Sequence, residues 1–259
     1  MLNYARYKIT IEYCGTKYFG WQKQENVPTI QGELDKVISK FLKENIQTYG
    51  ASRTDVGVHA FCQIAHFDLY SAINIIKIDS NYAKFIRSIN FFLQDKEISI
   101  LSIEKVELDF HARFSAKQKT YLYKIINRPA PSIMFNIKAW HIPKQLDINL
   151  MQSAALQFIG KKDFKSFAAT ELQQKSTIRN IIDITIIQNI LIKDQIDIYF
   201  TGKSFLHKMI RNITGTLVAC GLNKISINDI DNIFKAKNRT FANVTAPACG
   251  LYLANIQYE

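Results

Sequence analysis

The segment spanning residues 50–60, GASRTDVGVHA, concentrates side chains that can take part in chemistry. Arg53, Thr54, Asp55 and His59 stand there among small residues that bury little surface. The Asp55 carboxylate is the one group in the segment that can act as a nucleophile or general base near neutral pH without help, because an aspartate has a reference pKa of about 3.9. A neighbouring Arg53 guanidinium would hold that carboxylate ionised. The segment therefore offers Asp55 as a candidate reactive aspartate.

Two apolar runs, residues 46–49 and 61–67, flank this segment and are expected to form strands. A polar loop held between strands is where a rigid scaffold presents a reactive side chain. The same residue types also make ordinary turns, and an arginine near an aspartate is often a surface ion pair worth about 0–1 kcal/mol. Local chemistry leaves both interpretations open.

Basic residues are distributed unevenly along the 259 residues. The chain has 33 Lys and Arg against 22 Asp and Glu, a net charge of +11. Residues 1–108 hold 13 basic and 12 acidic side chains, so residues 109–259 hold 20 and 10. A polyanion is therefore a plausible partner, with the second half supplying most of the field.

Composition argues against several other classes. Hydrophobic residues make up 47% of the chain, which is typical of a folded protein. No apolar run reaches the roughly 18 residues of a membrane helix, and no signal peptide is expected. The four cysteines, at 14, 62, 220 and 249, form no CxxC pair, which favours reduced thiols in a cytoplasm over a zinc site or disulfides.

Periodicity predicts an α+β fold. Period-two alternation predicts strands over 6–13, 98–106, 115–126, 177–187, 190–201 and 251–258. Helical spacing predicts helices over 29–42, 79–92, 147–159, 205–220 and 227–235, with Thr29 and Asp147 as N-caps. Residues 160–167 are expected to be a basic loop. We expect two ferredoxin-like-type α+β domains, 1–108 and 109–259, whose mostly antiparallel sheets meet along a basic cleft.

Short segments in a particular order carry a family resemblance. They are YCGTKYFGWQKQ at 13–24, TIQGELD at 29–35, GASRTDVGVHA at 50–60, FHARFSAKQKTYLYKI at 110–125, DFKSF at 163–167, FLHKMIRNITGTLVACG at 205–221 and TAPACGLYL at 245–253. Nearly end to end, the chain resembles the TruA-type family of tRNA pseudouridine synthases. The commoner form of the family has Gly at the position of Ser52 and Val at the position of Ile210. We expect neither change to harm activity, although Ser52 narrows the φ choices of the loop.

The resemblance implies an isomerase that converts uridine to pseudouridine at positions 38, 39 and 40 of the tRNA anticodon stem-loop. This reaction breaks the bond from uracil N1 to the ribose, turns the base and rejoins it through C5. The resemblance implies that Asp55 is the nucleophile. It implies that Tyr121 stacks on the uracil and takes part in C5 proton transfer, and that Arg211 pairs with the Asp55 carboxylate. No redox or hydrolytic step occurs, so no metal or organic cofactor is expected.

The resemblance also implies partners: tRNA, bound in the basic cleft, and a second copy of the chain in a homodimer. Arg53 would act at the RNA backbone or in the space that a flipped base leaves. Four further cations are candidate phosphate contacts, which orient RNA without reading its sequence. They are Lys161, Lys162, Lys165 and Arg179. His59 is interpreted as part of the loop structure.

Three rival functions remain at this point. The first is an RNA-binding protein without catalysis, such as a tRNA chaperone, and intact Asp55, Tyr121 and Arg211 argue against it. The second is a metal-dependent nuclease that uses Asp55, which the lack of a second nearby acidic cluster weakens. The third is a pseudouridine synthase acting on uridines of other RNAs, and the sequence does not exclude it.

Overall fold

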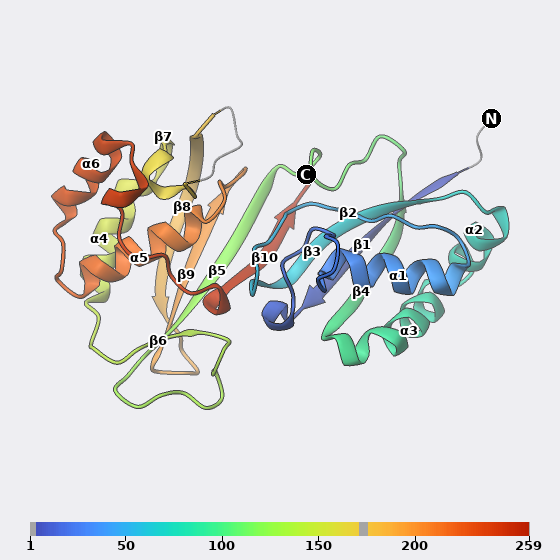
Figure 1. Cartoon of the computed structure of the whole chain (residues 1–259), viewed down its shortest axis with the longest axis horizontal. Helices are drawn as coiled ribbons and strands as arrows, with labels where there is room; N and C mark the ends of the chain where they lie inside the picture. The colour runs from blue at the N-terminus through green and yellow to red at the C-terminus, as the bar shows by residue number, and fades with distance from the viewer. Residues whose placement is uncertain (1–3, 171–175, 259) are drawn as a thin grey trace. The chain divides into compact units, whose positions relative to one another are not determined.

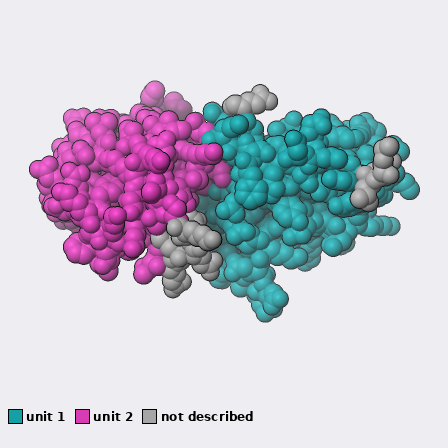
Figure 2. Space-filling model, turned by 90° about the horizontal axis from the view of Figure 1, so that it is seen from above, with its two compact units in different colours: residues 1–117, 253–259 teal, residues 118–252 magenta. Residues whose placement is uncertain are grey.

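A computed structural model describes residues 4–170 and 176–258 of the chain. They fall into two compact units, coloured separately in Figure 2. Unit 1 comprises Met1–Lys117 and Leu253–Glu259, and unit 2 comprises Gln118–Tyr252. The domains expected at 1–108 and 109–259 stay a prediction, because compact units defined by contacts need not coincide with domains.

Unit 1 is a sheet covered by helices (Figure 1). Its elements are β1 (Ala5–Tyr13), α1 (Ile30–Leu42), β2 (Tyr49–Gly50), β3 (His59–Leu69), α2 (Ala72–Asp79), α3 (Tyr82–Leu93) and β4 (Ile98–Val106). The strands β4, β1 and β3 lie in that order and pair antiparallel, and β2 pairs antiparallel with β3. The predicted alternation of β1 is confirmed, since Tyr7, Ile9 and Ile11 are fully buried. The Thr29 hydroxyl accepts a hydrogen bond from the Gly32 N–H, so the predicted N-cap of α1 is confirmed too.

Two predictions for unit 1 need correction. The strand expected at 46–49 is observed only at Tyr49–Gly50, because side chains of α1 form hydrogen bonds with the backbone N–H groups before it. The Asp35 carboxylate accepts from the Thr48 N–H at 2.8 Å, and the Ser39 hydroxyl accepts from the Ile46 N–H at 2.9 Å.

The helix expected at 79–92 is α3, which begins three residues later at Tyr82, and the preceding helix α2 (Ala72–Asp79) was not predicted. Asn81 interrupts the run by capping α3, since its side-chain oxygen accepts from the Lys84 N–H at 2.8 Å. The sequence concealed α2 because its isoleucines do not form one buried stripe: Ile73 and Ile76 are exposed and only Ile78 is fully buried.

Unit 2 repeats the combination of an antiparallel sheet with helices. Its elements are β5 (Gln118–Asn127), β6 (Trp140–Ile142), α4 (Ile148–Ala155), β7 (Gly160–Asp163), β8 (Ile178–Gln188), β9 (Gln195–Gly202), α5 (Met209–Gly221) and α6 (Ile227–Ala236). Strands β5, β9, β8 and β7 lie in that order and are antiparallel, whereas β6 pairs parallel with β5. The last strand, β10 (Leu251–Gln257), begins in unit 2 and ends in unit 1. The mixed α and β composition with mostly antiparallel strands is confirmed.

The expected basic loop at 160–167 is wrong. Residues Gly160–Asp163 form β7, and a 3-10 turn follows at Lys165–Phe167. The two phenylalanines of this segment are core residues, since Phe164 and Phe167 are fully buried. They pack with Phe158 and Phe234, the rings of Phe158 and Phe167 meeting edge to face at 5.1 Å.

Two helices of unit 2 are shorter than predicted. The helix expected at 147–159 ends at Ala155 and continues as a 3-10 turn, and Gly160 begins a strand at φ +96° rather than capping the helix. The helix expected from residue 205 begins at Met209, because Lys208 takes a left-handed conformation with φ 60°. Within the two described ranges, no helix combines the length and apolar character that a bilayer span requires.

Candidate functional site

The Asp55 loop, residues 51–58, leaves the sheet of unit 1 after β2 and returns to it at β3. Asp55 is half-buried, whereas Arg53 is exposed and Val56 is 55% exposed. The loop therefore presents a partly shielded carboxylate beside side chains that solvent reaches. A carboxylate placed in this way can act as a nucleophile while its neighbours contact a substrate.

Thr54, next to Asp55, is held by two residues of the 13–24 segment, Tyr13 and Trp21. The Trp21 N–H donates to the Thr54 carbonyl at 3.1 Å, and the Tyr13 hydroxyl lies 2.7 Å from the Thr54 hydroxyl oxygen. Gly20, at φ +88°, lets the two segments approach, because a Cβ there would lie 2.7 Å from the Thr54 carbonyl oxygen. The glycines of the opening segment thus serve the Asp55 loop.

The end of the loop after Asp55 is held as well. The Val58 N–H donates back to the Asp55 carbonyl at 3.2 Å, which closes a turn. His59 is 2% exposed, and its Nδ1 accepts a hydrogen bond from the Gly15 N–H at 3.1 Å. This contact gives His59 a structural part in fixing the loop.

Aromatic residues of the 13–24 segment divide between core and surface. Trp21 is 1% exposed and lies against Gly50, where a Cβ would come within 2.4 Å of the indole. Tyr18 is 5% exposed and its hydroxyl donates to the Lys96 carbonyl at 2.6 Å. Phe19, 49% exposed, is the ring of this segment that solvent reaches.

Ser52, where the commoner family form has Gly, does not take a positive φ. Its backbone conformation is therefore one that a residue with a Cβ adopts without strain. Serine is accommodated at this position.

Tyr121 lies on β5 in unit 2, opposite Phe200 of β9, and is 7% exposed. Its ring meets Phe205 edge to face at a centroid distance of 5.4 Å. Such a pair restricts the plane of the tyrosine ring.

Arg211 lies on α5 and is only half-buried, while every other residue from Met209 to Gly221 is buried. Its Nε donates to the Ala246 carbonyl at 2.7 Å, and the Ala246 N–H donates to the Arg211 carbonyl at 3.1 Å. Gly215 permits this contact between helix and loop, because a Cβ there would lie 1.8 Å from the Val244 carbonyl oxygen. Tyr123 holds the following residue, its hydroxyl donating to the Pro247 carbonyl at 2.8 Å, and burial raises the pKa of this hydroxyl well above its usual value.

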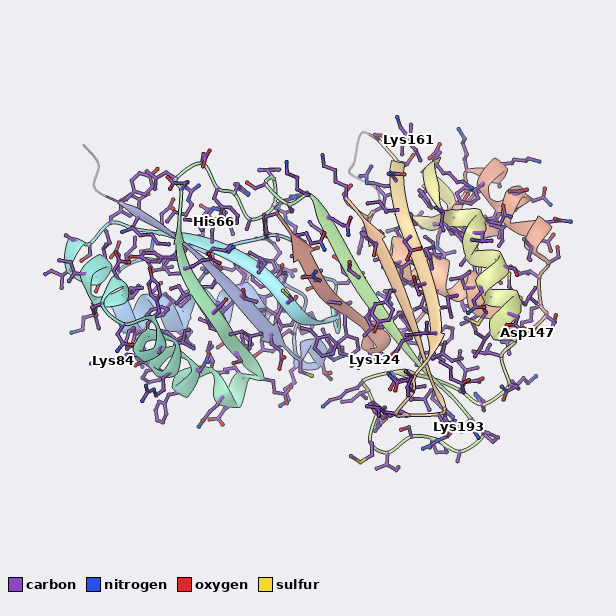
Figure 3. All side chains as sticks on the ribbon, turned by 180° about the vertical axis from the view of Figure 1, so that it is seen from behind. His66, Lys84, Lys124, Asp147, Lys161 and Lys193 are labelled. Atoms are coloured by element: carbon purple, nitrogen blue, oxygen red, sulfur yellow. The ribbon has the colours of Figure 1, made fainter. Side chains whose placement is uncertain are left out.

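The four candidate phosphate contacts differ in their surroundings. Lys161, labelled in Figure 3, and Lys165 are exposed. Lys162 donates to the Gln157 carbonyl and lies over the Phe234 ring at 5.4 Å. Arg179 donates to the Ser176 and Ile178 carbonyls, and burial lowers its pKa. Of the four, Lys161 and Lys165 are therefore the exposed ones, whereas Lys162 and Arg179 donate to backbone carbonyls of their own unit.

Three residues that hold the Asp55 loop were not predicted from the sequence: Tyr13, Trp21 and Gln63, whose side chain hydrogen-bonds both the N–H and the carbonyl of Ser52. One signal was present for Gln63, a polar residue inside the apolar run FCQIAHF. Across residues 4–170 and 176–258, no three His, Cys, Asp or Glu side chains lie close enough together to ligate a metal ion.

Comparison with known proteins gives matches along most of the chain. A family model described as tRNA pseudouridine synthase matches residues 9–115 and 154–259. The tRNA pseudouridine synthase A of Ehrlichia canis (strain Jake) is 44% identical over 255 residues, 98% of this chain and 100% of that protein. The tRNA pseudouridine synthase A of Anaplasma marginale (strain Florida) is 40% identical over 256 residues, again 98% and 100%.

A solved structure of an H/ACA ribonucleoprotein bound to a substrate RNA containing 2′-deoxyuridine is also similar. It covers 82% of this chain and 44% of its own, with a TM-score of 0.37 and 9% identity.

Proposed function

This chain belongs to the tRNA pseudouridine synthase family, and from that premise we propose that it isomerises uridine to pseudouridine in tRNA with Asp55 as the nucleophile. The Asp55 carboxylate adds to the target nucleotide and the N1–C1′ bond breaks. The base turns, C1′ bonds to C5, the bond to Asp55 breaks and returns the free carboxylate, the C5 proton leaves and N1 takes up a proton. Atoms balance without oxidant, reductant or water. Attack on the uracil ring and attack on C1′ are both compatible with this sequence of events.

The observation that carries this role is the immobilised backbone on both sides of Asp55. Thr54 before it is anchored by Trp21 and Tyr13, and the carbonyl of Asp55 itself accepts from Val58. A nucleophile held in one geometry avoids the entropic cost of finding it during the reaction. A surface loop with an incidental ion pair would not need these contacts.

Roles for Tyr121 and Arg211 follow from the family and agree with their surroundings. Tyr121 presents a ring of fixed plane, which suits stacking on the uracil, and its hydroxyl is proposed to take part in C5 proton transfer. The Arg211 guanidinium, anchored through Nε to Ala246, is proposed to pair with the Asp55 carboxylate. Replacing Tyr121 by Phe should retain stacking, and full turnover by this variant would exclude an essential role of the hydroxyl.

The finer features of the function are proposals of the same kind. We propose positions 38, 39 and 40 of the anticodon stem-loop as targets and a cytoplasmic homodimer as the working form. Two ferredoxin-like domains with a basic cleft would receive the tRNA. Arg53, exposed beside Asp55, would contact the RNA backbone or the space left by the flipped base. Lys161 and Lys165 would add salt-sensitive phosphate contacts, as would Lys162 and Arg179 if their side chains turn outward.

Tritium release from an unmodified tRNA transcript labelled as [5-³H]uridine tests the reaction and the nucleophile together. The C5 hydrogen must leave if uracil is rejoined through C5. We expect release by the wild type and none by Asp55→Ala, with tRNA affinity unchanged within a few-fold. Release by both proteins would remove Asp55 from the mechanism.

A tRNA chaperone gives a different outcome in the same experiment, since it would bind the transcript and release no tritium in either form. Labelled transcripts with single uridines at positions 38, 39 or 40 separate the proposed targets from other uridines. Release only from a uridine elsewhere would support a synthase of different specificity.

A further inference from the structure

Gln63 is a buried glutamine on β3 whose side chain faces the start of the Asp55 loop. It is 0% exposed. Its Nε2 donates to the Ser52 carbonyl at 2.7 Å, and its Oε1 accepts from the Ser52 N–H at 3.2 Å. Both backbone groups of one loop residue are thus bound by one side chain.

These two hydrogen bonds continue a strand ladder beyond its end. In the β2–β3 pairing Tyr49 lies opposite His66 and Gly50 opposite Ala65. The Ala51 N–H then donates to the Ile64 carbonyl at 2.7 Å. At Ser52 the chain turns away, and the Gln63 side chain supplies the partner that the backbone no longer does.

Glutamine suits this position because its amide has one acceptor oxygen and N–H donors, as a peptide group does. Glutamate has the same shape without the donor, and methionine has neither group. Without these bonds the Ser52 N–H and carbonyl would lose their partners in a half-buried place, which is unfavourable.

Anchors therefore stand on both sides of Arg53, with Ser52 held by Gln63 and Thr54 held by Tyr13 and Trp21. A chain segment fixed on both sides of one residue has few ways to reorient, and Asp55 follows directly. We infer that Gln63 is a positioning residue for the reaction, setting the direction in which the loop presents Asp55. This inference rests on the proposed function.

The test replaces Gln63 by Glu and, separately, by Met. Gln63→Glu sets a carboxylate oxygen against the Ser52 carbonyl, whereas Gln63→Met removes both bonds without adding charge. For each variant we would measure kcat by tritium release, the Kd for the tRNA transcript and the melting temperature. We expect kcat to fall by about 10- to 100-fold in both variants, with Kd within about threefold of wild type, because misplacing a reacting group by about 1 Å costs on the order of 100-fold.

Asn90 on α3 offers the matched control in the same unit. Its side chain is half-buried and also binds both backbone groups of one residue: its Nδ2 donates to the Ile100 carbonyl at 2.8 Å and its Oδ1 accepts from the Ile100 N–H at 2.8 Å. These bonds join α3 to β4 and involve neither the Asp55 loop nor the 13–24 segment, so Asn90→Asp and Asn90→Leu should lower the melting temperature comparably while kcat stays within about twofold. Equal kcat values for the variants at positions 63 and 90, measured well below their melting temperatures, would overturn the positioning role.

Asp55→Ala, assayed in parallel, distinguishes failure of the proposed function from failure of the role inferred for Gln63. Turnover by Asp55→Ala would contradict both the proposed function and this inference. An inactive Asp55→Ala beside fully active Gln63 variants would leave the proposed function intact and reject Gln63 alone. A rise in Kd with unchanged kcat would likewise reject it, since that pattern belongs to a residue that helps bind RNA.

Discussion

The Asp55 loop of unit 1 and the Arg211 helix of unit 2 hold the side chains proposed to be functional by different means. Residues 51–58 have no regular structure and depend on partners from β1, β3 and the 13–24 segment. Arg211 instead lies on α5, whose geometry is regular, and has one loop, residues 244–246, packed against it.

This difference predicts whether a substitution in each region lowers mainly activity or mainly stability. A loop held by separate hydrogen bonds can lose one of them and remain folded while its geometry drifts, so activity should fall more than stability. A buried helix carries the core of its unit, so a clash there should cost stability first. Substitutions that disturb one region and spare the other test this difference.

Gly215→Ala should have the largest effect. The new methyl group would lie 1.8 Å from the Val244 carbonyl oxygen, so α5 or the loop must move, and we expect a loss of about 3–5 kcal/mol. Denaturant unfolding measures it. Gly221→Ala on the same helix is the control, since its methyl would meet the flexible Met151 side chain at 2.7 Å and should cost much less. Equal losses at the two glycines would show that the Val244 contact does not matter.

Acid should destabilise unit 1 through His66, labelled in Figure 3 on β3 next to the strand end that leads into the loop. The pKa of His66 is lowered to about 4, first by burial and then by the nearby positive charges of Arg6 and His111. The Asp68 carboxylate has a weaker effect in the opposite direction. The unfolded chain binds this proton near pH 6.5 while the folded protein does not, so the contribution of His66 to stability is constant above pH 6.5 and falls from there to pH 4. The total is roughly 3 kcal/mol, at about 1.4 kcal/mol per pH unit.

Unfolding of His66→Gln at several pH values checks this assignment. The variant should show a flatter decline between pH 6.5 and 4 than the wild type, because other acidic and basic groups contribute equally to both. Parallel curves for the two proteins would mean that His66 titrates normally.

Gly20→Ala should lower activity more than stability. A left-handed conformation costs a residue with a Cβ about 1–2 kcal/mol, and the methyl group would also press on the Thr54 carbonyl at 2.7 Å. We expect kcat to fall by about 100-fold. Gly160→Ala provides the control, because Gly160 has a similar φ of +96° and nothing lies within 4 Å of its added Cβ. Wild-type kcat in Gly20→Ala would contradict the role of the 13–24 segment in holding the loop.

Tyr13→Phe should have the smallest effect, about 1 kcal/mol of stability, since it removes one buried hydrogen bond to Thr54. A reduction of kcat of a few-fold should accompany it. Tyr258→Phe removes a comparable bond, to the Ala112 carbonyl at 2.7 Å, elsewhere in unit 1. It should match Tyr13→Phe in melting temperature and retain the wild-type kcat, and a similar loss of kcat in both would remove the distinction.

Signals confined to a few neighbouring residues were readable from the sequence. Alternation identified β1, with Tyr7, Ile9 and Ile11 buried, and the capping side chains of Thr29 and Asp147 located the starts of α1 and α4. Asp55 could be singled out because its chemistry stands apart from the small residues around it. Each of these depends on backbone period or side-chain type, which the sequence contains directly.

Tertiary structure decided the lengths of several elements and the geometry of the Asp55 loop. The strand expected at 46–49 was shortened by Asp35 and Ser39, residues of a helix that precedes it in the chain. The loop takes its shape from Tyr13, 41 residues before Thr54, and from Gln63, 11 residues after Ser52. Such partners meet only when the sheet of unit 1 has formed, so no local sequence pattern predicts them. The sequence by itself thus determined which side chains can react, and long-range hydrogen bonds decided how firmly one of them is held.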